Sequence, residues 1–221
     1  MQILNALGVF LIAYLIGSIP MGLVLVKLAT GKDIRKIESG RTGGTNAMRA
    51  AGTLVGYGTT ILDILKAACT VWIAKGILPD NVWIHVVAPV FAVIGHNYSI
   101  YLIERDEDGK LKIGGGAGGT PALGGAVGLW WPNAFIIFPL SMLTFYGIGY
   151  ASVTTMSVPF IASLIFAYRA IWLGEPWEYI FFGVFAEMLI LWALRPNIKR
   201  LLNGTERSVG WRKKKNQQSE S

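Results

Sequence analysis

The sequence predicts an all-α protein, a polytopic membrane helix bundle of about seven transmembrane helices. Of its 221 residues, 53% are hydrophobic and only 15% are charged, whereas a soluble domain carries about a quarter charged residues. Sixteen of the twenty Lys and Arg residues fall in three segments, 30–51, 104–118 and 195–221. The long apolar stretches between these segments are typical of helices that cross a bilayer between loops on alternate sides.

Each stretch approaching about 20 apolar residues is interpreted as one crossing. The predicted spans are 3–29, 53–74, 83–103, 120–131, 134–151, 152–171 and 177–194. The first is interrupted by Gly17-Ser18-Ile19-Pro20. The stretch 120–131 is short and contains Pro121, so a tilted, re-entrant or protein-covered helix, and a total of five or six crossings, stay open as alternatives.

The distribution of positive charge predicts the orientation. The links 76–82, 131–133 and 172–176 carry no Lys or Arg, and cytoplasmic loops carry an excess of both. The N-terminus is therefore expected outside and the C-terminus in the cytoplasm. Five tryptophans are expected to form an aromatic belt at the outer ends, namely Trp83, Trp130, Trp131, Trp172 and Trp177. Residues 1–212 are expected to form one domain, and 213–221 a disordered basic and polar tail.

Two charged residues, Asp63 and Lys66, stand one helical turn apart inside the second predicted span. Charges at membrane depth are costly, and they usually pair with each other or line a functional cavity. The spacing permits an ion pair, and a role of Lys66 at a substrate site is the alternative.

The first polar segment combines glycines with hydroxyl, amide and guanidinium donors. Glycines let successive backbone N–H groups turn toward an anion, and a helix starting near Thr45 would aim its N-terminus at the same place. The candidate phosphate-binding residues are Ser39, Gly40, Gly43, Gly44, Thr45, Asn46 and Arg49. A flexible loop capped by Thr45 or Asn46 is the alternative.

The other two polar segments supply further candidates. The run 114–120 formally fits G-x-G-x-x-G, but no βαβ unit surrounds it, so its glycines indicate backbone packed against a ligand or another helix. His96 is either a hydrogen-bonded interface residue or part of a site. Residues 195–203 form an amphipathic pattern that explains the basic residues by lipid anchoring, but Asn197 and Glu206 are not needed for anchoring. The remaining candidates are Gly115, Gly116, Gly118, Thr120 and Ser152.

Six motifs occur in order along the chain. They are Gly17-Ser18-Ile19-Pro20, the block from Ser39 to Arg49, Asp63-Ile64-Leu65-Lys66, Gly95-His96-Asn97 with the glycine loop ending at Thr120, Gly149-Tyr150-Ala151-Ser152, and Asn197 to Glu206. In this ordered set the chain resembles the bacterial membrane-integral acyl-phosphate:glycerol-3-phosphate acyltransferase family, nearly from end to end.

The resemblance implies that a fatty acyl group moves from acyl phosphate to the 1-hydroxyl of glycerol 3-phosphate, giving lysophosphatidic acid and phosphate for phospholipid biosynthesis. It implies catalytic roles for Ser39, Asn46, Arg49, His96, Asn197 and Glu206, with the other candidates, Lys66 included, in substrate binding. The implied enzyme is a monomer in the bacterial cytoplasmic membrane with its site on the cytoplasmic face, and it uses no cofactor, metal or nucleic acid.

The chain departs from the family pattern at three places. Ala117 stands where the family loop carries a lysine, Leu194 stands where a histidine is usual, and Arg41-Thr42 replaces asparagine and an aliphatic residue. Losing a cation and a polar group at a phosphate site is not neutral. A paralogue that acylates another phosphorylated alcohol, or a non-catalytic lipid- or anion-binding membrane protein, are therefore the alternatives, and Lys110 or Lys112 of the hairpin could replace the missing cation.

Overall fold

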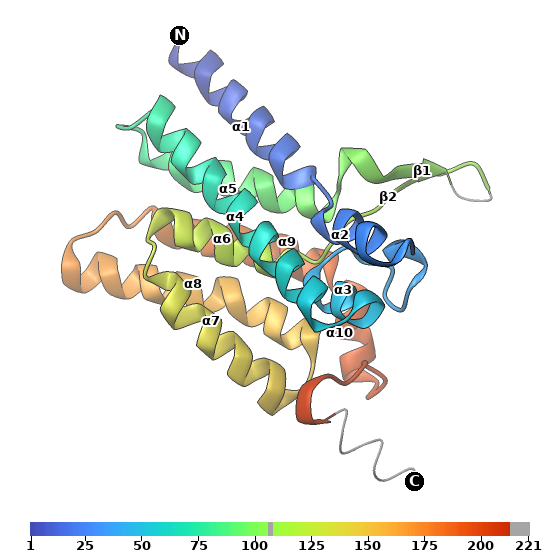
Figure 1. Ribbon diagram of the computed structural model, residues 1–221. Coiled ribbons are helices and arrows are strands. Elements are labelled where there is room, and N and C mark those ends of the chain that lie inside the picture. The colour runs from blue at the N-terminus through green and yellow to red at the C-terminus, as the bar shows by residue number, and fades with distance from the viewer. Residues whose placement is uncertain (106–107, 213–221) are drawn as a thin grey trace, which may run out of the picture.

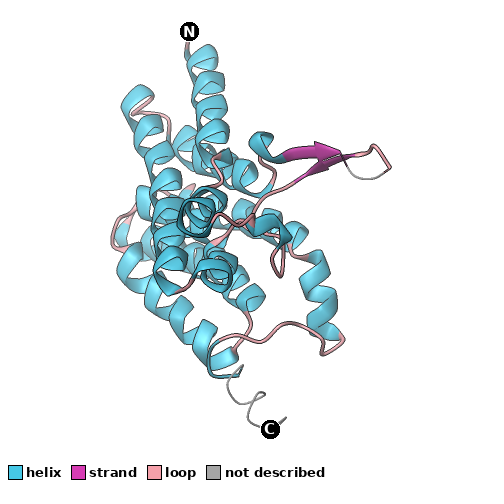
Figure 2. Cartoon of the chain, turned by 45° about the vertical axis from the view of Figure 1, so that its right-hand side comes forward, coloured by secondary structure: helices cyan, strands magenta, loops and turns pink. Residues whose placement is uncertain are grey.

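The computed structural model describes residues 1–105 and 108–212, and these are mainly helical (Figures 1 and 2). The predicted tail, 213–221, lies outside the described residues. The helices are α1 (Gln2–Ser18), α2 (Met21–Thr30), α3 (Gly44–Ala51), α4 (Thr53–Ile77), α5 (Val82–Asn97), α6 (Gly119–Leu129), α7 (Asn133–Leu143), α8 (Ala151–Leu173), α9 (Tyr179–Ala193) and α10 (Arg195–Leu202). Short 3-10 turns lie at Ile34–Lys36 and Ile100–Leu102, and a π-helical turn lies at Thr144–Ile148.

Helix α6 lies in the centre of the bundle, and its glycines explain why. A Cβ at Gly124 would overlap the backbone of α4 at Ile64, and one at Gly125 would overlap the Phe182 ring of α9. Small residues let membrane helices approach closely enough for van der Waals packing to hold them together. Most of α6 is buried as a result, so neighbouring helices cover it, which is one of the alternatives for the stretch 120–131.

The helices alternate in direction between two ends of the bundle. At one end Trp83 in the first turn of α5 and Trp177, just before α9, pack edge to face with ring centroids 5.8 Å apart. At that same end of Figure 1 lies the link from α6 to α7, and the Arg169 guanidinium of α8 stacks 3.9 Å above the ring of Trp130. The other end carries α2, α3, α10 and the hairpin (Figure 1).

Large apolar side chains cover much of the outer surface, as expected of a protein solvated by lipid. Three described helices are long and apolar enough to cross a membrane alone, Gln2–Thr30, Val82–Leu102 and Ala151–Leu173, and the bent α9–α10 pair makes four. Helices α6 and α7 have 11 residues each, so each rises about 16 Å against a hydrocarbon core of about 30 Å. The described helices therefore support a membrane protein, while seven crossings stay a prediction.

The loop after α2 is anchored to the hairpin. Strands β1 (Ile103–Arg105) and β2 (Leu111–Ile113) pair antiparallel with Ile103 opposite Ile113. Arg35 forms ion pairs with Glu104 of β1 and with Asp33 of its own loop. The hydrogen bond from Arg35 lowers the pKa of Asp33 to about 2. This anchoring sets the position of the chain that runs on toward residue 39.

Candidate active site

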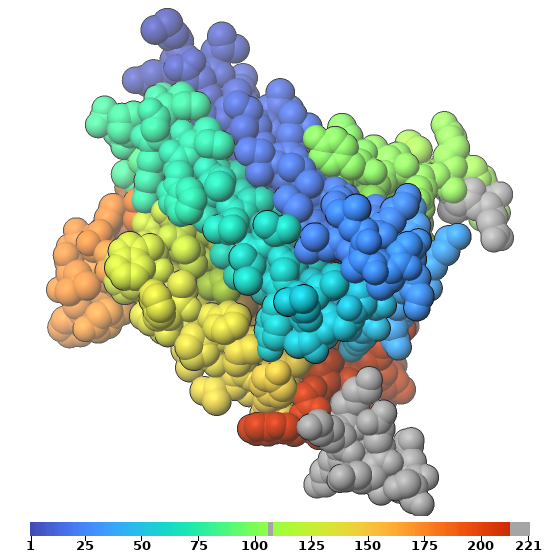
Figure 3. All heavy atoms as spheres, viewed as in Figure 1, coloured from blue at the N-terminus to red at the C-terminus, as the bar shows by residue number. Residues whose placement is uncertain are grey.

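The three polar segments converge on one pocket at the end of the bundle opposite the Trp83–Trp177 pair. Figure 3 shows the segments near residues 50 and 200 side by side on this face. The polar pocket is lined by twelve of the residues expected from the sequence, Ser39, Gly43, Gly44, Thr45, Asn46, Arg49, His96, Gly118, Thr120, Ser152, Asn197 and Glu206. Segments more than 150 residues apart in the chain therefore share one site.

Four helices begin at this pocket. The first turns of α3, α6, α8 and α10 line it through Gly44, Gly119, Ala151 and Asn197. The first N–H groups of a helix have no partner within the helix, and each N-terminus carries about half a positive charge. Several helix N-termini around one cavity favour an anionic ligand.

The side chains add more positive charge. Among the residues that the structure describes, Arg41, Arg49, Arg200 and Arg207 line the pocket against a single carboxylate, Glu206. Burial is the main cause that lowers the pKa of the Arg41 and Arg49 guanidinium groups from their ordinary value, although both stay charged at neutral pH. The excess of cations is therefore held partly out of water, where an anionic ligand gains most from it.

Glu206 organises one corner of the pocket. Its Oε1 accepts from Ser152 Oγ at 3.1 Å and from Asn197 Nδ2 at 2.8 Å, and its Oε2 accepts from Arg200 Nε at 3.0 Å. The carboxylate is only 5% exposed. These four residues, called the Glu206 cluster below, tie α8 to α10 and fix the direction of the Asn197 amide.

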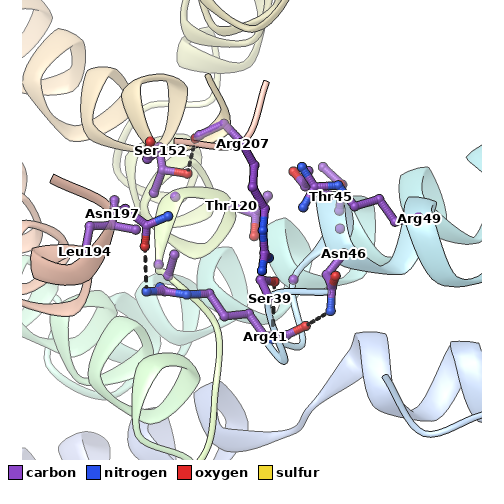
Figure 4. A pocket seen from close by; sticks show the side chains of 18 of the residues that line it. Ser39, Arg41, Thr45, Asn46, Arg49, Thr120, Ser152, Leu194, Asn197 and Arg207 are labelled. Atoms are coloured by element: carbon purple, nitrogen blue, oxygen red, sulfur yellow. Dashed lines mark hydrogen bonds between the residues drawn. The ribbon is translucent and has the colours of Figure 1, made fainter. Parts of the chain in front are cut away.

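Asn46 has a different position from the one expected of a phosphate ligand. Its Nδ2 donates to the carbonyl oxygens of Ile34, Ile37 and Arg41 at 3.2, 3.0 and 2.9 Å. Both amide hydrogens are thus committed to the backbone of the preceding loop (Figure 4). Asn46 lines the pocket, but its amide hydrogens hold the preceding loop in shape.

His96 lies above a buried ion pair. Lys66 Nζ forms an ion pair with Asp63 Oδ1 at 2.8 Å, and it donates to the carbonyl of Ile19 at 2.7 Å and to His96 Nδ1 at 3.1 Å. The predicted pairing of Asp63 with Lys66 is confirmed. Because an ammonium has only donors, His96 Nδ1 must accept, so we assign the imidazole proton to Nε2, on the side of Gly116.

Four expected site residues do not line the pocket. Lys66 lies behind His96, and Gly116 packs on the imidazole so closely that a Cβ there would overlap it. Gly40 and Gly115 line a neighbouring hollow beside the hairpin, together with Lys112. Among the described residues, neither Lys110 nor Lys112 lines the polar pocket. The hairpin lysines therefore do not supply the cation that Ala117 lacks.

The pocket is also lined by residues that were not among the candidate site residues. They are Arg41, Thr60, Ala117, Gly119, Ala151, Thr155, Leu194, Arg200 and Arg207. Thr60 stands one turn before Asp63 on α4, a spacing that could have suggested it. Arg200 was assigned to the amphipathic segment, where lipid anchoring explained its charge, and Arg207 was counted as one of the basic residues of the C-terminal segment.

An apolar groove adjoins the polar pocket. It shares Thr45, Thr60, Gly119, Thr120 and Thr155 with the polar pocket. It then runs between α3, α4, α6, α7 and α8, where its walls are mainly apolar, as at Met48, Leu123, Phe138, Met142, Phe145 and Val158. The cationic pocket and the apolar groove are therefore adjacent.

Comparison with known proteins agrees with this architecture. A family model described as glycerol-3-phosphate acyltransferase matches residues 7–204. The chain is 34% identical over 207 residues to a glycerol-3-phosphate acyltransferase of Rhodopseudomonas palustris (strain BisB5), covering 94% of this chain and 97% of that protein. It is 34% identical over 201 residues to glycerol-3-phosphate acyltransferase 2 of Moorella thermoacetica, covering 91% and 96%.

Solved structures give the same result. The crystal structure of PlsY, an integral membrane glycerol 3-phosphate acyltransferase, in its glycerol 3-phosphate form superposes with a TM-score of 0.78 at 30% identity, covering 93% of this chain and 96% of that one. Its lysophosphatidic acid form gives a TM-score of 0.76 at 29% identity, covering 93% of this chain and 95% of that one. The chain therefore belongs to the glycerol-3-phosphate acyltransferase family and is an integral membrane protein.

Proposed function

We propose that this protein transfers a fatty acyl group from acyl phosphate to the 1-hydroxyl of glycerol 3-phosphate, giving lysophosphatidic acid and inorganic phosphate. One observation carries the proposal: four helix N-termini and four arginines surround a pocket that has one lining carboxylate among the described residues, and an apolar groove adjoins this pocket. Two phosphates and one acyl chain are the ligands that such a combination suits.

The two substrates divide the hollow between them. The acyl chain occupies the apolar groove, which brings its activated carbonyl to the shared rim at Thr45 and Thr120. The donor phosphate binds the N-terminal turns of α3 and α6, with Ser39 at the loop before α3. Glycerol 3-phosphate enters between Arg49 and the Glu206 cluster, where the Asn197 amide and the Ser152 hydroxyl are held for it.

The reaction needs no enzyme nucleophile, because acyl phosphate is already activated. The acceptor oxygen forms a bond to the acyl carbon, and the bond from that carbon to the phosphate oxygen breaks. The protein contributes by aligning the two substrates and by stabilising the oxyanion. His96, with Nδ1 occupied by Lys66, acts as an Nε2–H donor rather than a base, so the hydroxyl proton leaves to a substrate phosphate.

The topology belongs to the same proposal. Residues 1–212 form one domain that crosses the bacterial cytoplasmic membrane seven times as a monomer, with the N-terminus outside and the C-terminus in the cytoplasm. The polar pocket then opens on the cytoplasmic face. The distribution of charge supports this orientation, because the end of the bundle with the pocket carries the Lys- and Arg-rich segments, while the opposite end carries Trp83 and Trp177.

The purified protein, given palmitoyl phosphate and glycerol 3-phosphate, should release phosphate and lysophosphatidic acid in equal amounts. Phosphate released without an acceptor would indicate hydrolysis alone. Product formed only with another phosphorylated alcohol would indicate a paralogue that acylates that alcohol. No product with any acceptor would indicate a non-catalytic binding protein. Arg49→Ala should raise the KM for glycerol 3-phosphate without lowering expression, and unchanged kinetics would remove Arg49 from the site.

Cysteine labelling tests the topology independently of activity. In a Cys69→Ala background, single cysteines at Ser39, Thr120 and Asn197 should react with an impermeant maleimide only from the cytoplasmic side. A cysteine at Trp131 should react only from outside. Reaction of the first three from opposite sides would end the proposal of a shared cytoplasmic site.

A further inference from the structure

Arg41 reaches across the polar pocket from the loop before α3. Its Nη2 donates to the carbonyl of Ala193 at 2.8 Å and to Asn197 Oδ1 at 3.1 Å, and its Nη1 lies 3.5 Å from the carbonyl of Gly116. Figure 4 shows the side chain extending from the loop to Asn197. A single guanidinium therefore touches the glycine loop and the corner between α9 and α10.

All three of these acceptors are neutral oxygens, although the group carries a full charge. Arg41 forms no ion pair with a carboxylate in the part of the chain that the structure describes. The nearby Glu206 accepts from Ser152, Asn197 and Arg200 instead. Burial is the main cause that lowers the pKa of Arg41. A half-buried cation of this kind is expected to have an anionic ligand.

The hydrogen-bonding capacity of Arg41 is not exhausted. A guanidinium has five N–H donors, and the three bonds involve only Nη1 and Nη2. The Nε–H and one Nη1 hydrogen are left within the described residues, and each can donate to an oxygen of an anionic ligand. Asn46 also fixes the backbone at this residue, since its Nδ2 donates to the Arg41 carbonyl at 2.9 Å.

No other cation is available to this side of the pocket from the glycine loop. Residues 114–120 contain no charged side chain, and the loop reaches the pocket with Ala117 and Gly118. Arg41 is the lining arginine that contacts this loop, through the carbonyl of Gly116.

We propose that Arg41 is a phosphate-binding residue that holds the phosphate of the acceptor substrate between the glycine loop and Asn197. Because Arg41 bonds to Asn197 and lies beside the Glu206 cluster, it serves the acceptor and not the acyl donor. The identity of that acceptor as glycerol 3-phosphate rests on the proposed function. The binding of a phosphate monoester by Arg41 does not rest on the proposed function.

The test compares Arg41→Gln and Arg41→Lys with Lys32→Ala, which removes one exposed positive charge from the same segment outside the pocket. Dissociation constants for glycerol 3-phosphate are measured by calorimetry in detergent, together with KM and kcat at saturating palmitoyl phosphate. Arg41→Gln should raise both Kd and KM for glycerol 3-phosphate about 10- to 100-fold, as for a lost charge-assisted bond. The KM for palmitoyl phosphate should change little, Arg41→Lys should recover part of the loss, and Lys32→Ala should match wild type.

The outcomes separate the two proposals. A Kd for glycerol 3-phosphate equal to wild type in Arg41→Gln would overturn the role of Arg41 even if the wild-type enzyme transfers acyl groups. A wild-type protein that makes no lysophosphatidic acid, yet binds glycerol 3-phosphate in an Arg41-dependent way, would overturn the proposed reaction alone. Equal losses in Arg41→Gln and Arg41→Lys, with lower melting temperatures and unchanged KM, would reduce Arg41 to a structural role.

Discussion

Replacing Glu206 by glutamine removes one negative charge from the corner of the polar pocket while it keeps the size of the side chain. The amide oxygen can still accept from Ser152 and Asn197, but the amide NH₂ then faces Arg200 Nε, which now donates to Oε2 at 3.0 Å. A hydrogen bond to a charged group contributes about 1.5–3 kcal/mol. The carboxylate is 5% exposed and the Arg200 side chain 40% exposed, so water replaces part of the loss.

The lower half of that range applies, about 1.5–2 kcal/mol, which corresponds to a fall of roughly 10- to 30-fold in kcat/KM for glycerol 3-phosphate. The assay follows lysophosphatidic acid at low acceptor concentration. Glu175→Gln is the matched control, because that carboxylate pairs with Arg169 at 2.8 Å beside the opposite end of the bundle. A Glu206→Gln enzyme with wild-type kcat/KM would refute the positioning role of the Glu206 cluster.

Asp63→Asn should destabilise the protein by about 3–5 kcal/mol, because it leaves the buried Lys66 ammonium without its carboxylate; thermal unfolding in detergent measures this, and an unchanged melting temperature would contradict it. Gly116→Ala should abolish acyl transfer by pushing the imidazole below it out of place, while Gly76→Ala, where a Cβ meets nothing within 4 Å, should keep wild-type activity. The Asp33 carboxylate has a pKa lowered from 3.8 to about 2, so its stabilising contribution is present above pH 4 and is lost as the pH falls from about 4 to about 2. In Asp33→Asn, hydrogen exchange of residues 33–37 should be faster at pH 6 and lose its difference from wild type near pH 2; identical exchange rates at pH 6 would count against the anchoring role.

The helices could be predicted from the sequence because an apolar stretch of about 20 residues in lipid is expected to form a helix. All seven predicted spans contain helices, and the break at Ile19-Pro20 falls between α1 and α2 as expected. The short length of α6 was harder to interpret, because this helix is covered by other helices and its glycines pack against α4 and α9.

The candidate site was only partly predictable. Glycines, hydroxyls and Asn197 indicated which loops meet, but the pattern did not reveal that the Asn46 amide turns back on its own loop. Arg41 contacts a carbonyl 152 residues further along the chain. No local spacing rule reports such a contact, because it depends on how the whole bundle brings the two segments together.

The short, glycine-lined α6 has a consequence for biogenesis. A segment of 11 residues cannot be released into the bilayer by a translocon as an independent anchor, because its ends would remain inside the hydrocarbon. It can pack against the earlier α4, but it must wait for the later α8 and α9 before its remaining faces are covered. A nascent chain that stops soon after residue 130 thus lacks half of the cradle for this helix, and assembly of the catalytic end becomes one of the last events of synthesis.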